Sequence, residues 1–424
     1  MSLPVAGNYT VKLATPDGSS RHYRITGEPT QWTSVAPPLA SASAYAVVDL
    51  VADRTGQPVV GFTQTVNVGG QPPAYLLMLR RWNGSAWETV GADLTIPQGC
   101  TGNGSAVTAF AFDSNNAPVV AYASNTNAGG SSVTALRYTG GAWQPLGANG
   151  GVLPNASTVG GACTISPPAL AFAGDGAPLL AYVADNIIYV QRFDGAAWGP
   201  ATTTGTDQFP INGGSMDLRA DANGQIWLVT ADPGAGPTTV RRLNSSTSPA
   251  NWTPVGPNSG VLPQVTTAGL NAPQLRFDGA NEPVIAFRAT VTTAGGAYGV
   301  AVYRYDGSQW SSSGGYEADA STHLQYTSNV GVAIYGGETY LSWTYSTNTY
   351  SAPIAQKYTG SGFTPVDAGL GTIPQFTPHG LVESQGFEPR VLSAGSGLYM
   401  ALVTKAPTGS PAPLLAIQLL QKLN

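Results

Sequence analysis

One aromatic residue recurs along the chain at nearly constant spacing, and this repeat limits the possible folds more than any other feature. Tryptophan occupies the first six positions and phenylalanine the seventh: Trp32, Trp87, Trp143, Trp198, Trp252, Trp310 and Phe363. The intervals between them are 55, 56, 55, 54, 58 and 53 residues. A period of this length indicates a repeat architecture, in which each repeat is one supersecondary unit packed against its neighbours. The repeat therefore overrides the two or three domains that a length of 424 residues would suggest.

The sequence around each repeated aromatic predicts a β-hairpin. A basic residue stands six positions before most of these aromatics, at Arg81, Arg137, Arg192, Arg304 and Lys357, and Arg242 keeps the pattern with four residues inserted before Trp252. Turn dipeptides that tolerate a positive φ follow in several units, as at Asn83-Gly84, Asp194-Gly195 and Asp306-Gly307. We expect the repeated aromatic to open the last strand of its unit. The basic residue is expected to be structural, packing on a ring or pairing with a carboxylate.

A second hairpin precedes the first in every unit. Two short apolar segments flank a turn, as in Thr108 to Asp113 followed by Pro118 to Tyr122. Near-continuous apolar runs of this kind are typical of strands that are buried on both faces. Four short strands per unit, repeated seven times, predict an all-β fold: a seven-bladed β-propeller of four-stranded antiparallel blades. We expect residues 1–424 to form a single propeller domain.

The two ends of the chain predict how the ring closes. The last residues, Gln421 to Asn424, match Arg241 to Asn244 at the end of a third strand, and no fourth strand follows them. A matching fourth strand occurs around Trp32, so we expect residues 1–36 to complete the C-terminal blade. Arg24 to Gly27 also resembles a third strand. Either this segment pairs outside the blades, or residues 9–36 form a truncated eighth unit.

The repeat also carries a family resemblance. The pattern from Arg304 to Trp310, Arg-Tyr-Asp-Gly-x-x-Trp, follows a strand that begins Pro-Val-x-Ala-aromatic in several units. It resembles the repeats of bacterial secreted or surface propellers, in the style of the kelch and sialidase-type families. The resemblance implies the blade structure and no particular activity. The sialidase Asp-box is not reproduced, because Phe193 to Trp198 lacks the leading serine.

Candidate site residues are those that break the repeat in the innermost strands. At the position two residues before the aspartate that ends each of these strands, the first two units carry Val51 and Ala111. The fourth and fifth units carry Arg219 and Arg276 there. An aspartate lies on the same face two residues before the first of these arginines, and another arginine opens the seventh inner strand. Buried charges need partners, so the residues form either inter-blade salt bridges or an anion or sugar site near the channel mouth. The candidate ligand-binding residues are Asp217, Arg219, Arg276 and Arg390.

Loop lengths predict which face of the ring carries the function. The links between units, and the loops between second and third strands, are long and dissimilar, and in four-stranded blades they emerge on one face. Our preferred hypothesis is a secreted or cell-surface binding or adhesion protein, lectin-like, with loop aromatics stacking on sugar rings (Tyr316, Phe209 and Phe376). An alternative is a carbohydrate-active enzyme, a glycoside hydrolase or polysaccharide lyase, with candidate carboxylates at Asp217, Glu317, Asp319 and Glu383. A third is a structural subunit of an extracellular assembly, favoured by the charged fraction of only 10%.

Composition argues against several other classes of protein. A net charge of −5 does not favour a nucleic-acid partner. The sequence contains no run of 18 apolar residues, so it predicts no transmembrane segment. The first ten residues show no secretion signal. The three histidines, His22, His323 and His379, lack a metal-ligand spacing, and the Asp-rich turns fit tight hairpins better than calcium loops. We therefore expect no metal or cofactor.

The two cysteines occupy equivalent positions in neighbouring units. Cys100 stands 13 residues before Asp113, and Cys163 stands 12 before Asp175. Equivalent sites on adjacent blades could reach the Cα separation of about 5.5–6 Å that a disulfide needs. A bridge would imply an oxidising compartment, and hence an extracellular or cell-surface location. The alternative is two independent thiols.

Overall fold

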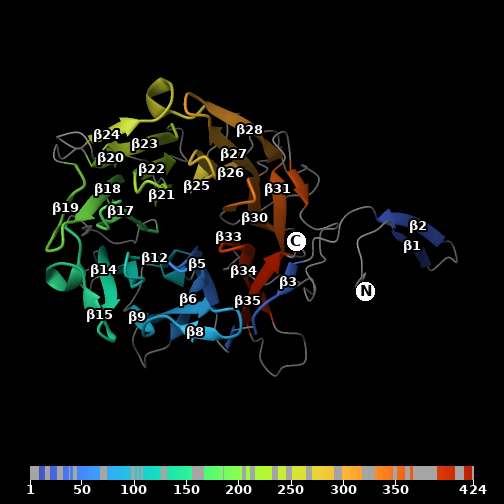
Figure 1. The fold of residues 1–424 in the computed structure, drawn as a ribbon, viewed down its shortest axis with the longest axis horizontal. Helices are drawn as coiled ribbons and strands as arrows, with labels where there is room; N and C mark the ends of the chain where they lie inside the picture. The colour runs from blue at the N-terminus through green and yellow to red at the C-terminus, as the bar shows by residue number, and fades with distance from the viewer. Residues whose placement is uncertain are drawn as a thin grey trace.

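The computed structural model of the chain describes residues 9–14, 20–25, 32–37, 39–41, 45–66, 74–96, 101–102, 105–106, 108–125, 131–154, 167–184, 186–202, 207–210, 215–231, 237–244, 251–263, 270–290, 298–317, 330–346, 351–358, 363–365, 389–405 and 415–422. Within these residues, seven antiparallel sheets, each with a path of four hydrogen-bonded strands, form a ring (Figure 1). The prediction of a seven-bladed β-propeller is confirmed.

The first four blades each run from an innermost to an outermost strand in chain order. Blade 1 contains β5 (Tyr45–Ala52), β6 (Pro58–Val66), β7 (Ala74–Trp82) and β8 (Trp87–Thr89), with β9 (Leu94–Ile96) pairing with β7. Blade 2 contains β12 (Thr108–Phe112), β13 (Pro118–Asn125), β14 (Ser131–Thr139) and β15 (Ala142–Pro145). Blade 3 contains β16 (Ala169–Phe172), β17 (Pro178–Ala184), β18 (Ile187–Phe193) and β19 (Trp198–Pro200), with β20 (Gln208–Pro210) pairing with β18. Blade 4 contains β21 (Ser215–Ala220), β22 (Ile226–Ala231), β23 (Thr239–Asn244) and β24 (Asn251–Pro254).

The remaining blades follow the same order except at the closing strand. Blade 5 contains β25 (Leu270–Phe277), β26 (Pro283–Thr290), β27 (Tyr298–Tyr305) and β28 (Trp310–Glu317). Blade 6 contains β29 (Gly331–Tyr335), β30 (Glu338–Ser346), β31 (Ser351–Tyr358) and β32 (Phe363–Pro365). Blade 7 contains β33 (Arg390–Ala394), β34 (Gly397–Lys405) and β35 (Leu415–Lys422), and takes its outer strand from the N-terminal part of the chain. Two short pairs lie outside the blades: β1 (Tyr9–Ala14) with β2 (Ser20–Ile25), and β10 (Thr101–Gly102) with β11 (Ser105–Ala106).

The ring closes through β3 (Trp32–Ser34), which pairs antiparallel with β35 and places Trp32 opposite Lys422. A second segment, β4 (Leu39–Ser41), pairs with the other half of the same strand. The predicted closure is therefore confirmed. The extra strand-like segment at Arg24 lies at the end of β2, which pairs with β1 in a two-stranded hairpin. Of the two interpretations of this segment, pairing outside the blades is correct.

The repeated tryptophans join neighbouring blades. The indole Nε1 donates a hydrogen bond to a backbone oxygen of the preceding blade at 2.7–2.9 Å, in the pairs Trp87–Pro37, Trp143–Ala92, Trp198–Leu146 and Trp310–Val255. Each ring also packs on the aromatic that ends the third strand of its own blade. Trp198 and Trp310 are buried, whereas Trp87 and Trp143 are half-buried. The tryptophan repeat thus fixes the contact between blades as well as the fold within each blade.

The first turn of blades 1 to 5 carries an aspartate whose carboxylate caps backbone amides of the same turn. Asp53, Asp113, Asp221 and Asp278 all accept such bonds, which supports the interpretation of these residues as turn formers. In four blades the repeated arginine forms an ion pair with an aspartate of this turn, in the pairs Arg81–Asp53, Arg137–Asp113, Arg192–Asp175 and Arg304–Asp278. The expected structural role of this arginine is confirmed there.

Two sequence predictions fall on segments outside the described residues. Cys100 and Cys163 both lie there, so the disulfide stays a prediction. His323 and His379 also lie outside the described residues. Among the residues that are described, no helix is long and apolar enough to cross a membrane.

Candidate functional site at the axis of the ring

The innermost strands line the axis of the ring (Figure 1). Alternate residues of a strand share one face, and the register of these strands with their neighbours defines two equivalent layers of residues. The first layer, nearer the long-loop end, consists of Asp49, Ala109, Ala169, Asp217, Gln274, Gly331 and Arg390. The second layer, two residues further along each strand, consists of Val51, Ala111, Ala171, Arg219, Arg276, Ala333 and Leu392. In the second layer five of the seven residues are small or apolar and the other two are arginines, whereas the first layer contains three charged residues. We call Asp49, Asp217, Arg219, Arg276 and Arg390 the axial cluster.

One contact of the axial cluster joins two blades that are not neighbours in the ring. Arg219 Nε lies 3.0 Å from Asp217 Oδ1 within blade 4. The same guanidinium reaches blade 1, where its Nη2 lies 3.8 Å from Asp49 Oδ2. Blades 2 and 3 separate these two blades in the chain order, so the contact crosses the axis. Arg276 Nη1 of blade 5 lies 3.7 Å from Asp217 Oδ2, an oxygen that also accepts the Leu275 amide at 2.8 Å.

The structure brings together Asp217, Arg219 and Arg276 in ion pairs, one of them between blades 4 and 5; their role as ligand-binding residues stays a prediction. Arg390 lies in the first layer of blade 7, and its positive charge contributes to the lowered pKa of Arg276. Sequence reasoning missed Asp49. The signal was present, because Asp49 precedes Asp53 by four residues just as Asp217 precedes Asp221.

The electrostatics of the cluster leave a surplus of positive charge. Three arginines face two aspartates, so the net formal charge is +1. Burial disfavours the charged form of Arg219, but the carboxylates of Asp217 and Asp49 outweigh it and raise its pKa. For Arg276 burial dominates, the neighbouring Arg219 and Arg390 add repulsion, and the pKa falls to about 10. Water still reaches Arg276, whose side chain is 20% exposed.

Two β-bulges adjoin the cluster. In β5 the register shifts between Val47 and Asp49, and in β25 it shifts between Asn271 and Gln274. Ala272, inside the second bulge, has a φ of +49°, an uncommon value for a residue with a Cβ, and its amide donates to Ser215 Oγ at 2.8 Å. Bulges redirect side chains and are enriched beside functional sites. Both bulges lie directly before a first-layer residue on the long-loop side.

The structure gives a different picture of the predicted loop aromatics. Phe209 is not an exposed loop residue, because it is half-buried in β20, packs edge-on against Trp252 and lies under the guanidinium of Arg241. Phe376 lies outside the described residues, as do Asp319 and Glu383. Tyr316 and Glu317 belong to β28, and their side chains are likewise outside the description.

The fold defines the class of protein, a seven-bladed β-propeller, and comparisons with solved structures agree with it. An ulvan lyase described as a new family of polysaccharide lyase, bound to -[GlcA(1-4)Rha3S]-, superposes with a TM-score of 0.51 and 11% identity, over 92% of this chain and 94% of that one. The polysaccharide lyase Uly1 superposes with a TM-score of 0.50 and 10% identity, over 92% and 100%. The lectin SapL1, solved with alpha methyl fucoside, gives a TM-score of 0.39 and 18% identity over 70% and 87%.

Sequence comparisons add no family to this picture. No protein-family model matches the chain, and no curated protein matches it. At the identities given above, the structural likeness establishes the fold alone.

Proposed function

We propose that this chain is a secreted or cell-surface carbohydrate-binding propeller, lectin-like in function, that recognises an acidic sugar at the axial cluster from the long-loop face. The observation that carries the proposal is the pair of second-layer arginines, Arg219 and Arg276. Arg219 lies 3.0 Å from an oxygen of Asp217, whereas Arg276 has its nearest carboxylate oxygen at 3.7 Å and donates to the Leu275 carbonyl. Arg276 is thus the guanidinium best able to accept an anionic group.

The charge balance favours an anion at this position. The positive form of Arg276 is disfavoured by burial and by two neighbouring arginines, as its lowered pKa indicates. A carboxylate or sulfate would offset both effects, and a guanidinium binds such groups with two parallel hydrogen bonds. An acidic sugar supplies this anion together with hydroxyls for the amide of Gln274.

The structural neighbours support a saccharide as the carrier of that anion. Two neighbours with TM-scores of 0.50 and 0.51 are polysaccharide lyases, and the ligand named for one of them contains a uronic acid and a sulfated sugar. Polysaccharides of this kind occur outside cells, which is consistent with the proposed location.

Substitution of Arg276 by alanine tests the proposal. Blades 2, 3 and 6 already carry alanine in this layer, so the Arg276→Ala chain should fold. We expect uronate and sulfated oligosaccharides to bind the unaltered protein in isothermal titration and neutral ones of equal length not to bind. Arg276→Ala should weaken binding about tenfold or more, the effect of losing a hydrogen bond to a charged group. Arg54→Ala, on the opposite face, is the control and should bind normally. Equal affinity of Arg276→Ala and Arg54→Ala would refute the axial site.

A polysaccharide lyase is the second candidate function, favoured by the same two neighbours. A lyase would release unsaturated uronates from an acidic polysaccharide, and their ultraviolet absorbance would rise with time. Tight binding without this absorbance would exclude the lyase and leave the binding function in place.

A further inference from the structure

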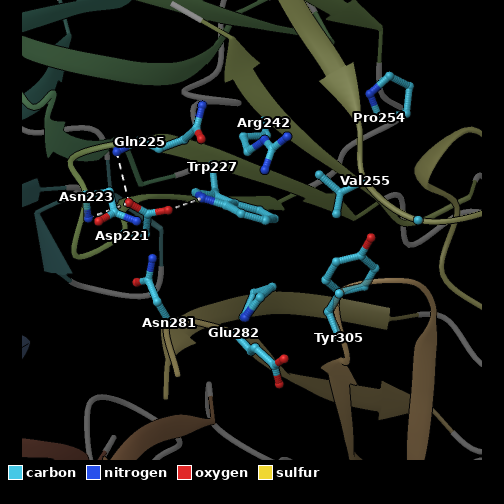
Figure 2. A pocket seen from close by; sticks show the side chains of 13 residues that line it. Asp221, Asn223, Gln225, Trp227, Arg242, Pro254, Val255, Asn281, Glu282 and Tyr305 are labelled. Atoms are coloured by element: carbon cyan, nitrogen blue, oxygen red, sulfur yellow. Dashed lines mark hydrogen bonds between the residues drawn. The ribbon is translucent and has the colours of Figure 1, made fainter. Parts of the chain in front are cut away.

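A cleft opens between blades 4 and 5, on the face that carries the first turns of the blades. It encloses about 360 Å³. Trp227 and Arg242 of blade 4 line one side, and Glu282 and Tyr305 of blade 5 line the other (Figure 2). Its volume is near the lower end of the range for small-molecule sites, roughly 300–1,000 Å³, so it suits a ligand about one ring in size.

Blade 4 departs from its sister blades at this cleft. In four other blades the repeated arginine pairs with an aspartate of the first turn. The residue opposite that arginine in the second strand is small or aliphatic in those blades: Val59, Val119, Leu179 and Val284. In blade 4 the residue opposite Arg242 is Trp227.

Trp227 hydrogen-bonds to the first-turn carboxylate, Asp221, whose counterpart pairs with the repeated arginine in four other blades. Its Nε1 donates to Asp221 Oδ2 at 3.1 Å, while Asp221 Oδ1 accepts the amides of Asn223 and Gln225 at 2.8 and 3.0 Å. Both oxygens of Asp221 are therefore occupied. Arg242 instead lies over the Trp227 ring, with its guanidinium carbon 5.5 Å from the ring centroid.

The result is an exposed cation without a carboxylate partner. Among the described residues, no aspartate or glutamate oxygen lies within 4.0 Å of the Arg242 guanidinium, and its side chain faces solvent. A guanidinium held over an aromatic ring keeps its donors in one plane, ready for a planar anion.

The opposite wall supplies groups of a different kind. The Tyr305 ring is half-buried against Trp310, with a centroid distance of 5.0 Å, and is held in place at the edge of the cleft. Glu282 contributes its backbone to the turn, and within the described part of the chain its carboxylate has no hydrogen-bond partner. A sugar ring presents an apolar face to an aromatic ring and hydroxyl donors to a carboxylate, so this wall complements a sugar.

We propose that the cleft between blades 4 and 5 binds a single anionic sugar residue, with Arg242 pairing with its carboxylate or sulfate, Tyr305 against its ring and Glu282 accepting from its hydroxyls. This site goes beyond the proposed function, because it lies on the other face of the ring and uses none of the axial cluster. The protein would thereby contact acidic saccharides at two separate places.

Two variants separate the charge from the fold. Arg242→Gln removes the cation without breaking an ion pair. Trp227→Val restores the residue of the sister blades and frees Asp221 Oδ2 to pair with Arg242. The matched control is Arg137→Gln, at the same repeat position in blade 2, where the arginine is paired with Asp113. The probes are methyl glucuronoside, methyl glucoside, glucose 6-sulfate and benzoate, titrated against the full chain and followed by NMR chemical shifts.

We expect methyl glucuronoside and glucose 6-sulfate to bind and methyl glucoside to bind at least about tenfold more weakly. In the chemical shifts of Tyr305, which lines the cleft and lies outside the axial cluster, Arg242→Gln and Trp227→Val should each lose this preference, and Arg137→Gln and Arg276→Ala should keep it. The Arg276→Ala control separates the cleft from the axial site, because a variant of one site should leave binding at the other unchanged. Binding of benzoate as tight as that of the sugars would overturn the assignment to a sugar. Unchanged affinity in Arg242→Gln, or no binding by any anionic probe, would overturn the site itself.

Discussion

At the scale of single residues, the first-turn aspartates link local turn geometry to the contacts between blades. Asp53 shows this most fully, because its buried carboxylate holds its own turn, pairs with Arg81 and accepts a bond from Asn116 of the next blade. Burial opposes the ionisation of Asp53, but the hydrogen bonds from Thr55, the Gln57 amide, Arg81 and Asn116 outweigh it. Together they lower its pKa from 3.8 to about 2.

This pKa predicts the pH dependence of an Asp53→Asn variant. The folded pKa lies below the unfolded one, so the stabilisation is complete above about pH 4 and is lost as the pH falls toward 2. A pKa lowered from 3.8 to about 2 corresponds to about 2 kcal/mol of stability. Asp53→Asn should therefore reduce the free energy of unfolding by about that amount at pH 7, and the difference from the unaltered chain should shrink below pH 4 in denaturant titrations.

Asp93→Asn provides the control for this experiment. It removes a more exposed ion pair with Arg80 and should cost less than about 1 kcal/mol. A difference between Asp53→Asn and the unaltered chain that stays constant from pH 7 to pH 2 would contradict the proposed role of the carboxylate.

At the scale of elements, the first turns of neighbouring blades contact each other directly. The Arg54 and Ala222 amides donate to the side chains of Asn116 and Asn281 in the next blade, at 2.8 and 2.9 Å. Between blades 3 and 4 the contact is backbone to backbone, from the Gly174 amide to the Gly224 oxygen at 2.9 Å. Glycine allows this approach because a Cβ on Gly224 would lie 2.3 Å from the Cα of Gly174.

We predict that Gly224→Ala is much more destabilising than Gly195→Ala. Both glycines have a positive φ, +74° and +103°, so each alanine incurs a backbone cost of about 1–2 kcal/mol. A Cβ on Gly195 would meet no atom within 4 Å, whereas one on Gly224 adds overpacking of about 1–3 kcal/mol. Thermal unfolding of the two variants measures the difference. Equal losses would mean that the turns can separate without cost.

The sequence was sufficient for the blades because each one repeats the same local signals. Turn dipeptides, apolar runs and the tryptophan recur every 53–58 residues, so each signal is read several times. The residues of the candidate sites depart from that repeat, so the sequence gives each of them only one signal. Arg219 and Arg276 could be found because they replace small residues. Asp49 could not be paired with Arg219 from sequence, because the contact depends on which blades face each other across the axis.

The cleft between blades 4 and 5 was harder to predict for a related reason. Trp227 stands within an apolar strand and resembles any buried aromatic in sequence. Its effect appears only when the indole is seen to occupy the carboxylate of Asp221. The loss of an arginine partner is therefore a property of the packed blade.

At the scale of the whole molecule, the ring depends on one junction between distant parts of the chain. Blades 1 to 6 are each built from consecutive strands, whereas blade 7 joins β33, β34 and β35 to β3 from the N-terminal part of the chain. Beyond the ladder of β3, the Val35 amide donates to the Leu419 oxygen at 3.1 Å, and Trp87 of blade 1 donates to the Pro37 oxygen at 2.8 Å. Loss of β3 would thus expose an edge of blade 7 and remove a contact to blade 1.

Two truncations separate this junction from the hairpin that precedes it. Removal of residues 1–25 deletes β1 and β2, which pair with no other strand in the described part of the chain, and should leave the Tm nearly unchanged. Removal of residues 1–36 also deletes β3 and should lower the Tm sharply. A synthetic peptide of residues 26–41 should restore the Tm of the shorter chain as its concentration rises, because a segment that binds only the folded ring stabilises it by mass action. Equal Tm values for the two truncations would show that the ring is held closed by contacts other than β3.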